Sequence, residues 1–435
     1  MNRTIVFCMA LMLTAVSLSG CTGDDTELNA ANERIAELEF QVENDQERIA
    51  GLESEAEADE ARYQKFMDDF SDDLEEEWYS GFLQGYAEGA PVSTLDLVID
   101  RGYMNCGVKD AQYGMGYAGG SGYSGLDIEY CAAIAAAIGL NYEDINFVLA
   151  TGADRFNLLS NGDIDVLIRT TTWTTSRDAG LNTDFAGINF YDGQGIMIRS
   201  DFVTADEAES SIYGLDGANI CVGLGTTSEM NIVDWSYASG VSINPVYVAT
   251  TTEAMAEFIG GTCDAYTGDS SALVAHKWQI DNDGSMGADD DGNDIEIWIG
   301  QELLSKEPLA AVTRDYDSEW NEVVSWVWYA MVTAEEMGIS STNYGSADTS
   351  DPSVDRLLYS NMGLGTDANP LPSTWVQNVL DSVGNYGEAY DRSFCDGSYD
   401  GVSGSDTMTG CLISRSGTYN ALVSEGGLQY APPMR

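Results

Sequence analysis

Hydroxyl and guanidinium side chains follow a strand-like segment at residues 164–177, IDVLIRTTTWTTSR. The buried-strand pattern of Ile164–Ile168 runs directly into five threonines, a serine, a tryptophan and two arginines. Hydroxyls and backbone amides donate hydrogen bonds, and a guanidinium binds a carboxylate through a planar two-pronged fork. No nucleophile stands beside a base in this stretch, so the pattern predicts the capture of a small acid rather than chemistry on it.

The N-terminal segment predicts export and lipid attachment. Arg3 supplies a positive start, and the apolar segment after it is too short to span a bilayer as a mature helix. Leu18-Ser19-Gly20-Cys21 resembles the cleavage motif of secreted lipoproteins. We therefore expect residues 1–20 to be a lipoprotein signal peptide and Cys21 to anchor the protein to the cell membrane, at the cell surface or in the periplasm. An ordinary signal peptide with an incidental cysteine is the alternative.

The composition excludes a nucleic-acid-binding face. The formal net charge is -54, from 72 acidic against 18 basic residues. Affinity for nucleic acid comes from lysine and arginine contacts to phosphates, so no nucleic-acid partner is expected. Many carboxylates with few lysines resemble the halophilic acidic surface of proteins from salt-rich habitats, where ions screen self-repulsion. The hydrophobic fraction of 44% indicates a folded protein.

Cysteine usage agrees with export. Cys8 would leave with the signal peptide and Cys21 would carry lipid, so six cysteines remain. An even number in a secreted chain predicts disulfides but leaves their connectivity open. The most local pairing joins Cys106 to Cys131, Cys221 to Cys263 and Cys395 to Cys411. Free buried thiols are the alternative.

We expect no cofactor and no metal. The chain has no CxxC pair, and its single histidine, His276, is expected to be an inert helix residue. The insert at 281–294 carries six aspartates and could hold calcium. It lacks the glutamate that closes an EF-hand loop, which favours a solvated acidic loop.

A heptad pattern follows the leader. Apolar residues recur every seven positions at Leu28, Ile35, Val42, Ile49 and Ala56. This spacing predicts a helical stalk, either a self-associating coiled coil or a single solvated acidic helix. Residues 21–93 are thus assigned to the lipid anchor, the stalk and a linker.

Strand-like and helix-like segments alternate in the body, which begins near Thr94. Strands are expected at Met104–Val108, Ile145–Ala150 and Ile164–Ile168, helices at Asp127–Leu140, Asp154–Ser160 and Ser318–Met337, and further segments of the alternation at Ile196–Ile198, Asn219–Val222, Val246–Ala249, Thr252–Gly260, Asp264–Thr267, Ile295–Ile299 and Leu309–Thr313. The alternation predicts an α/β architecture with mostly parallel sheets. Similar successions on either side of about residue 200 predict two lobes.

Several stretches of the body together resemble one family. GLDIEYCAAIAAAIG, DRFNLLSNGDIDVLIRTTTWTTSRD, ICVGLGTTSEMN, CDAYTGDSSAL and SKEPLAAV are similar to the polar and general L-amino-acid-binding proteins of ABC importers, solute-binding protein family 3. The resemblance implies a type II periplasmic-binding-protein fold with a hinge, in which residues 94–199 and 305–435 form lobe 1 and residues 200–304 form lobe 2. It also implies free L-amino acids as ligands, ABC permease subunits as partners and no enzymatic activity.

The resemblance further implies a set of ligand contacts. The family's arginine for the ligand α-carboxylate matches Arg177, and the hydroxyl positions before it match Thr170 and Thr172. The GTT turn that opens a helix in the second lobe places Thr227 as a further donor. The family's acid for the α-ammonium group matches Asp269. Binding to both lobes would favour their closure.

These side chains also have structural alternatives. Arg177 could form a surface salt bridge to Asp178 or Asp184, and Asp269 could be a helix N-cap. The two threonines before Arg177 could be ordinary strand residues. Asp127 is expected to begin a helix rather than to contact ligand.

Side-chain specificity stays open. Many relatives have a small residue where this chain has Arg169, and both Arg169 and Arg155 are expected to form structural ion pairs. The aromatic that stacks on the ligand in narrower relatives has no clear counterpart here. Among the available aromatics, Trp173, Tyr113 and Tyr117, we assign Trp173 and Tyr113 to the pocket wall.

Two other functions compete with transport. The same fold carries enzymes such as cyclic-acid dehydratases, which need a general acid or base facing the cleft. Glu229 is one carboxylate that could serve, although no pattern marks it out. The other alternative is a membrane-anchored amino-acid sensor whose stalk positions the body for a membrane partner.

Overall fold

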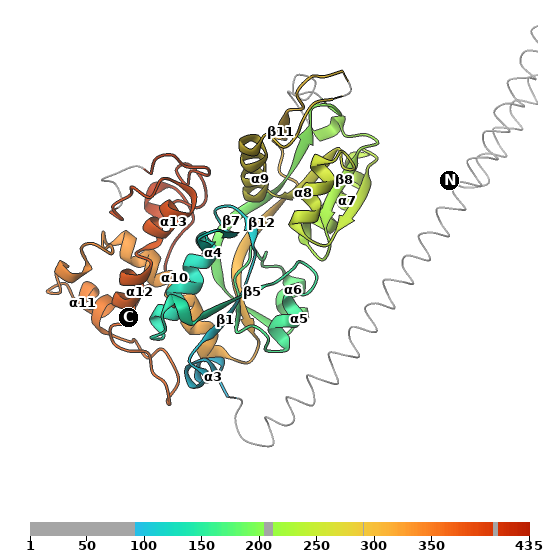
Figure 1. Cartoon of the computed structure of the whole chain (residues 1–435). Coiled ribbons are helices and arrows are strands. Elements are labelled where there is room, and N and C mark those ends of the chain that lie inside the picture. Colours follow the sequence, from blue (N-terminus) through green and yellow to red (C-terminus); the bar gives the residue numbers. More distant parts are fainter. Residues whose placement is uncertain (1–91, 204–211, 290, 403–407) are drawn as a thin grey trace, which may run out of the picture. The chain divides into compact units, whose positions relative to one another are not determined.

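The structure, a computed structural model, describes residues 92–203, 212–289, 291–402 and 408–435 (Figure 1). The predicted signal peptide, the lipid-bearing Cys21 and the stalk lie outside these residues, so they stay predictions. No helix in the described ranges is long and apolar enough to cross a bilayer.

The first lobe is built on three parallel strands, β5 (Ile145–Leu149), β1 (Met104–Val108) and β6 (Val166–Leu167). Around them lie α3 (Thr94–Arg101), α4 (Leu126–Ala137), α5 (Arg155–Ser160), α6 (Thr175–Gly180) and a small antiparallel sheet of β2 (Ala111–Gln112), β3 (Gly116–Gly119) and β4 (Gly122–Ser124). The alanine-rich α4 is buried along almost its whole length. Its small side chains let neighbouring elements approach closely.

The second lobe repeats this plan with β10 (Ala265–Asp269), β8 (Asn219–Gly223) and β9 (Asn244–Val248), again parallel. Its helices are α7 (Thr227–Ser239), α8 (Thr251–Ile259) and α9 (Ser270–Asp283). Thr226 and Thr250 cap the starts of α7 and α8, because each hydroxyl accepts a backbone N–H from the first turn. The helices therefore begin at the carboxyl ends of the strands.

Two long antiparallel strands, β7 (Thr183–Arg199) and β12 (Ser305–Arg314), run through both lobes. One end of β12 pairs with β6 in the first lobe, and the far end of β7 pairs with β10 and with β11 (Ile297–Ile299) in the second. The sequence predicts only an apolar part of each strand, Ile196–Ile198 of β7 and Leu309–Thr313 of β12. Gly187, Gly193 and polar residues interrupt the alternation of β7, so hydrophobic periodicity does not reveal its length.

The C-terminal region adds α10 (Ser318–Glu336), α11 (Pro352–Tyr359), α12 (Trp375–Ser382) and α13 (Tyr386–Phe394) to the first lobe. Helices α10, α12 and α13 contact α4 (Figure 1). Their side chains join one hydrophobic core. Trp320, Trp328 and Trp375 are fully buried there. Of these helices the sequence analysis predicts α10 alone.

The predicted fold class is confirmed, since the described chain is a mixed α/β protein with two lobes and a two-stranded connection. The main strands are parallel within each lobe, and antiparallel pairing occurs in the connection with its neighbours and in the small β2–β3–β4 sheet. The exact boundaries at 199/200 and 304/305 stay predictions.

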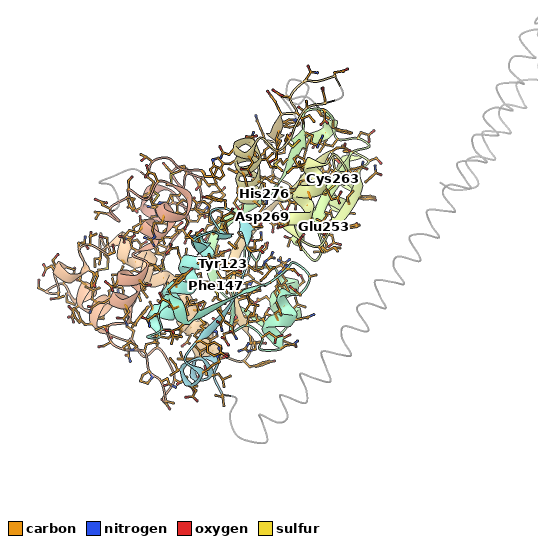
Figure 2. The ribbon with its side chains drawn as sticks, in the orientation of Figure 1. Tyr123, Phe147, Glu253, Cys263, Asp269 and His276 are labelled. Carbon is orange, nitrogen blue, oxygen red and sulfur yellow. A yellow bond between two sulfur atoms is a disulfide. The ribbon has the colours of Figure 1, made fainter. Side chains whose placement is uncertain are left out.

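The predicted disulfides are present, and of the connectivities left open they take the most local one. Cys106 on β1 bonds Cys131 on α4, Cys221 on β8 bonds Cys263, which is labelled in Figure 2, and Cys395 bonds Cys411. The first two pairs lie wholly in the core. The first joins β1 to α4 and the second joins β8 to the segment before β10, so the alternative of free buried thiols is wrong.

The second-lobe disulfide is expected to stabilise the protein strongly. It closes a separation of 42 residues, for which the loop-entropy relation gives about 4 kcal/mol. The double substitution Cys221→Ala with Cys263→Ala should lower the free energy of unfolding by that amount in urea titrations. Its matched control, Cys395→Ala with Cys411→Ala, closes a separation of 16 residues and should cost about 3 kcal/mol. A Cys221→Ala, Cys263→Ala variant with the same free energy of unfolding as the wild type would contradict the stabilising role of this disulfide.

Candidate functional site

A cavity of about 240 Å³ is walled by both lobes. Its lining comes from the segments that follow β1, β5 and β6 in the first lobe and β8, β9 and β10 in the second. Ligands of open α/β sheets bind outside the carboxyl ends of the strands, which is where this cavity lies. Its volume is below the range of about 300–1,000 Å³ that suits drug-sized ligands, so a small metabolite fits it best.

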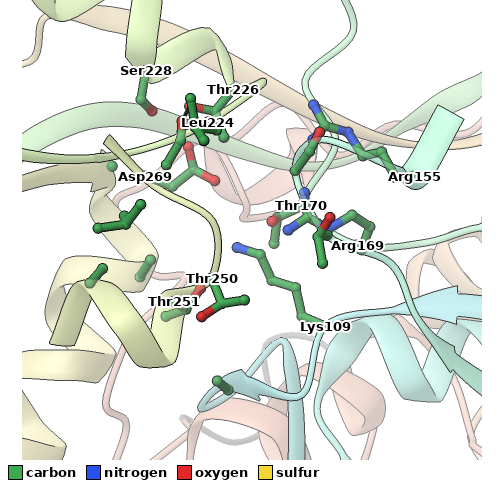
Figure 3. A pocket seen from close by; sticks show the side chains of 18 of the residues that line it. Lys109, Arg155, Arg169, Thr170, Leu224, Thr226, Ser228, Thr250, Thr251 and Asp269 are labelled. Carbon is green, nitrogen blue, oxygen red and sulfur yellow. Dashed lines mark hydrogen bonds between the residues drawn. The ribbon is translucent and has the colours of Figure 1, made fainter. Parts of the chain in front are cut away.

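Positive side chains dominate the cavity wall. Four cations line it, namely Lys109, Arg155, Arg169 and Arg177, against the carboxylates of Asp110 and Asp269. Figure 3 shows Lys109, Arg155, Arg169 and Asp269 around the cavity. The whole chain holds only 18 basic residues against 72 acidic ones. The concentration of bases in one small cavity therefore marks it as a site for an anionic group.

Thr170 has an unusual backbone in this wall. Its φ is +48°, in the left-handed region that β-branched residues avoid, at a cost of about 1–3 kcal/mol. Its backbone amide hydrogen-bonds the carboxyl group of Asp127 at the start of α4. Its hydroxyl is buried and has no partner among the described residues. A strained residue with a free hydroxyl in a cavity is typical of a binding site.

Arg177 is a buried cation rather than a surface one. Only 8% of it is exposed, and it makes no ion pair within the described ranges, so the salt bridge to Asp178 or Asp184 is wrong. Its Nη1 donates to the carbonyl of Thr172 at 2.9 Å. Burial lowers the pKa of Arg177 to about 10, and the charge of Glu307 opposes that shift. It stays protonated at neutral pH and can receive an anion.

Glu307, on β12, was not predicted as a site residue. Its Oε2 accepts hydrogen bonds from the hydroxyls of Thr172 at 2.5 Å and Thr227 at 2.8 Å, and its Oε1 accepts from Asn231 at 3.1 Å and from Ser305. Two hydroxyls assigned to the ligand carboxylate are thus bonded to a carboxylate of the chain itself. An acid within a strand gives no sequence signal for this role, apart from its place in the SKEPLAAV stretch.

Asp269 lies at the end of β10, where α9 begins. It occupies the N-cap position, as the structural alternative states, but its side chain makes no capping hydrogen bond. Burial raises the pKa of Asp269, and the charge of Lys109 counteracts this. In Figure 3 the Lys109 amino group reaches into the space between Asp269, Thr170 and Arg169. Burial and the charge of Arg169 lower the pKa of Lys109 to about 8.

The ion pairs expected for Arg155 and Arg169 are wrong, since neither forms one in the described part of the chain. Arg155 donates to the carbonyls of Gly152, in its own lobe, and Gly225, in the other lobe, the second at 3.0 Å. A Cβ atom at Gly152 would lie 2.5 Å from the Leu224 carbonyl oxygen, so the two loops touch there and only glycine fits. Arg155 therefore links the lobes.

Trp173 and Tyr113 are not among the residues that line the cavity. The Trp173 ring stacks on Phe185 with centroids 5.5 Å apart, and the Tyr113 ring packs against Trp278 at 4.8 Å. The carboxylate of Glu229, the candidate base, accepts the Gly225 backbone N–H at 2.8 Å and does not line the cavity either.

His276 is buried in α9, and burial lowers its pKa to about 3. Its ring therefore stays neutral, in agreement with the expectation of an inert helix residue.

Comparison with known proteins gives a consistent result. Residues 104–344 match the family of bacterial extracellular solute-binding proteins, family 3. A glutamate/glutamine/aspartate/asparagine-binding protein of Rhodobacter capsulatus is 37% identical over 80% of this chain and 95% of its own length. A general L-amino acid-binding periplasmic protein of Rhizobium johnstonii is 35% identical, with the same coverage.

A solved structure shares both fold and sequence. It is a periplasmic binding protein of an ABC transporter from Brucella ovis with glutathione bound, with a TM-score of 0.67 and 36% identity. The likeness covers 79% of this chain and all of that one. These relatives and the family are binding proteins.

The Glu307 network is expected to stabilise the protein. Glu307→Ala would leave the hydroxyls of Thr172 and Thr227 and the amide of Asn231 without their acceptor, and should lower the free energy of unfolding by about 3 kcal/mol. Chemical denaturation measures this. The control Glu322→Ala, at an exposed site on α10, should change it by less than about 0.5 kcal/mol. A loss at Glu307 as small as in the control would contradict a stabilising role.

Proposed function

The chain belongs to the bacterial extracellular solute-binding proteins of family 3, and from this we propose that it captures amino acids outside the cytoplasm and delivers them to the permease of an ABC importer. The amino-acid binding named for the Rhodobacter and Rhizobium relatives supports this, because the match extends over 95% of each relative. The body of this chain thus corresponds to a complete binding protein of that kind.

The observation that carries the proposal is the pair of opposite charges in the cavity. Arg177 and the free hydroxyl of Thr170 come from the first lobe, and Asp269 comes from the second. In the proposed complex, the ligand α-carboxylate binds Arg177 and Thr170 through charge-assisted hydrogen bonds. The α-ammonium group binds Asp269, whose carboxylate has no capping role. A zwitterion matches this arrangement.

Thr172 and Thr227 take an indirect part in this proposal. Their hydroxyls bond Glu307, and Thr172 also gives its carbonyl to Arg177. They hold the Arg177 guanidinium and the start of α7 in place beside the ligand. Trp173 and Tyr113 contribute by packing outside the cavity.

Closure of the lobes is proposed to couple binding to transport. The lobes are joined by β7 and β12, and the ligand would contribute contacts to both sides only when they are close. The Arg155 bond to the Gly225 carbonyl adds a contact of the same kind. A permease that recognises the closed form would then take up only loaded protein.

Binding without chemistry suits the cavity lining better than catalysis does. The described lining contains no histidine or cysteine. Glu229, the base considered for an enzyme, holds the turn before α7 instead. A catalytic group would need to reach the ligand with a proton acceptor or donor matched to the task.

Titration calorimetry with a panel of L-amino acids tests the proposal. We expect at least one amino acid to release or absorb heat with a dissociation constant in or below the micromolar range. Circular dichroism on the same sample establishes that it is folded. A folded protein that gives no heat with any amino acid would refute the function.

Arg177→Ala should lower the affinity for the bound amino acid about 100-fold, because a charge-assisted bond to the carboxylate is lost. The matched control is Arg392→Ala, whose guanidinium pairs with Glu129 at 2.7 Å on the surface. The control should bind as the wild type does. Near-normal affinity of the Arg177 variant would exclude its carboxylate role.

A lipid at Cys21 is proposed to hold the protein at the membrane. Cys21→Ser should move the protein from the membrane fraction to the soluble fraction and abolish labelling by a radioactive fatty acid. Cys8→Ser, a change within the predicted signal peptide, serves as the control. Membrane association that survives Cys21→Ser would contradict the anchor.

A further inference from the structure

Building on the proposed amino-acid-binding function, we infer that the cavity contains a second anion subsite, formed by Arg169 and Lys109, for a carboxylate beyond the ligand α-carboxylate. The ligand would then be an acidic amino acid or a small γ-glutamyl peptide. Of these two, the cavity volume of about 240 Å³ suits the acidic amino acid better.

Arg169 is a buried cation that forms no ion pair in the part of the chain that the structure describes. It is 8% exposed and lines the cavity. Its Nε is fully buried and unpaired. A buried guanidinium without partners is costly. An anion in the cavity would give the Arg169 guanidinium the ion-pair partner that the described residues do not provide.

The neighbouring acids do not neutralise Arg169 by contact. Asp127 and Asp269 act on its charge through space, and neither lies within ion-pair distance of it. Asp127 accepts the Thr170 backbone amide, and its Oδ2 has no hydrogen-bond partner in the described chain. Burial raises the pKa of Asp127 to about 6. Room for a closer anion therefore remains beside Arg169.

Lys109 faces the same space as Arg169 (Figure 3). Its Nζ donates to Oε1 of Gln112 at 2.6 Å, and the Gln112 amide donates to the Ser271 hydroxyl at 3.0 Å. This chain of hydrogen bonds fixes the ammonium group at the cavity wall, and the ammonium forms no ion pair with a residue that the structure describes. Two fixed cations on the same space make a preorganised receptor for a carboxylate.

The other two cations are already engaged. Arg155 bonds the carbonyls of Gly152 and Gly225, and Arg177 bonds the carbonyl of Thr172 and is assigned to the α-carboxylate. A neutral amino acid would therefore use Arg177 and Asp269 and leave Arg169 unpaired. A ligand with a second carboxylate would bind Arg177 and Asp269 and would also pair with Arg169.

The test compares L-glutamate with L-glutamine, which have the same size and differ by one charge. Wild-type protein should bind L-glutamate at least about tenfold more tightly, the ratio that one added charge-assisted contact provides. Arg169→Gln should reduce this ratio about tenfold while the affinity for L-glutamine changes by less than about threefold. Lys109→Gln should reduce the ratio in the same direction.

Controls that remove one positive charge elsewhere separate the subsite from a general charge effect. Arg392→Gln and Lys277→Gln each break a surface pair, with Glu129 and with Asp281. Neither should change the ratio. L-aspartate and glutathione, tested in parallel, show whether the second carboxylate belongs to a short side chain or to a peptide.

The outcomes are distinguishable. A wild-type ratio near one, or a ratio that neither Arg169→Gln nor Lys109→Gln lowers, overturns the subsite, and binding of L-glutamine in that case keeps the proposed function. Failure of the whole panel to bind would remove the function as well. If Arg169→Gln does not fold, the wild-type ratio and Lys109→Gln still decide.

Discussion

The pairing of β7 with β12 is the constraint on which the cavity depends. These two strands pass from one lobe to the other, so they set where the carboxyl ends of the parallel strands meet. Glu307 lies on β12, and its carboxylate accepts hydrogen bonds from the hydroxyls of Thr172, in the segment after β6, and Thr227, at the start of α7. A buried carboxylate is stable only when its lone pairs are satisfied. The hinge and the site walls are thus bound into one hydrogen-bonded unit.

Several groups in the cavity wall are held in energetically costly states. Thr170 has a left-handed backbone, its hydroxyl is unpaired, and burial lowers the pKa of Arg169 and of Lys109 while it raises that of Asp269. An anion beside Thr170, Arg169 and Lys109 and an ammonium ion beside Asp269 would supply the missing partners and reduce these costs. In the proposed function, a ligand that carries both charges would therefore stabilise the closed arrangement, and binding would be coupled to closure.

Residue types and local spacing carried much of the prediction. Arg177 on α6 and Asp269 at the end of β10 both line the cavity, and the alternation of segments and the local disulfides agree with the structure. The ion pairs of Arg155 and Arg169 and the pocket role of Trp173 do not. An arginine near acids in sequence has many possible partners, and the strand and helix directions decide which one it reaches. The length of β7 was missed because glycines break its pattern.

The sequence by itself determined the fold class and the residue types available to build a site, because these follow from periodicity and composition, while it left the disulfide connectivity open. Only the tertiary structure decided which partner each charge has. Glu307 and Thr172 are 135 residues apart in the chain, and Arg155 and Gly225 are 70 apart. Contacts of that range arise when two lobes fold onto a shared pair of strands, and no local pattern encodes the distance between them.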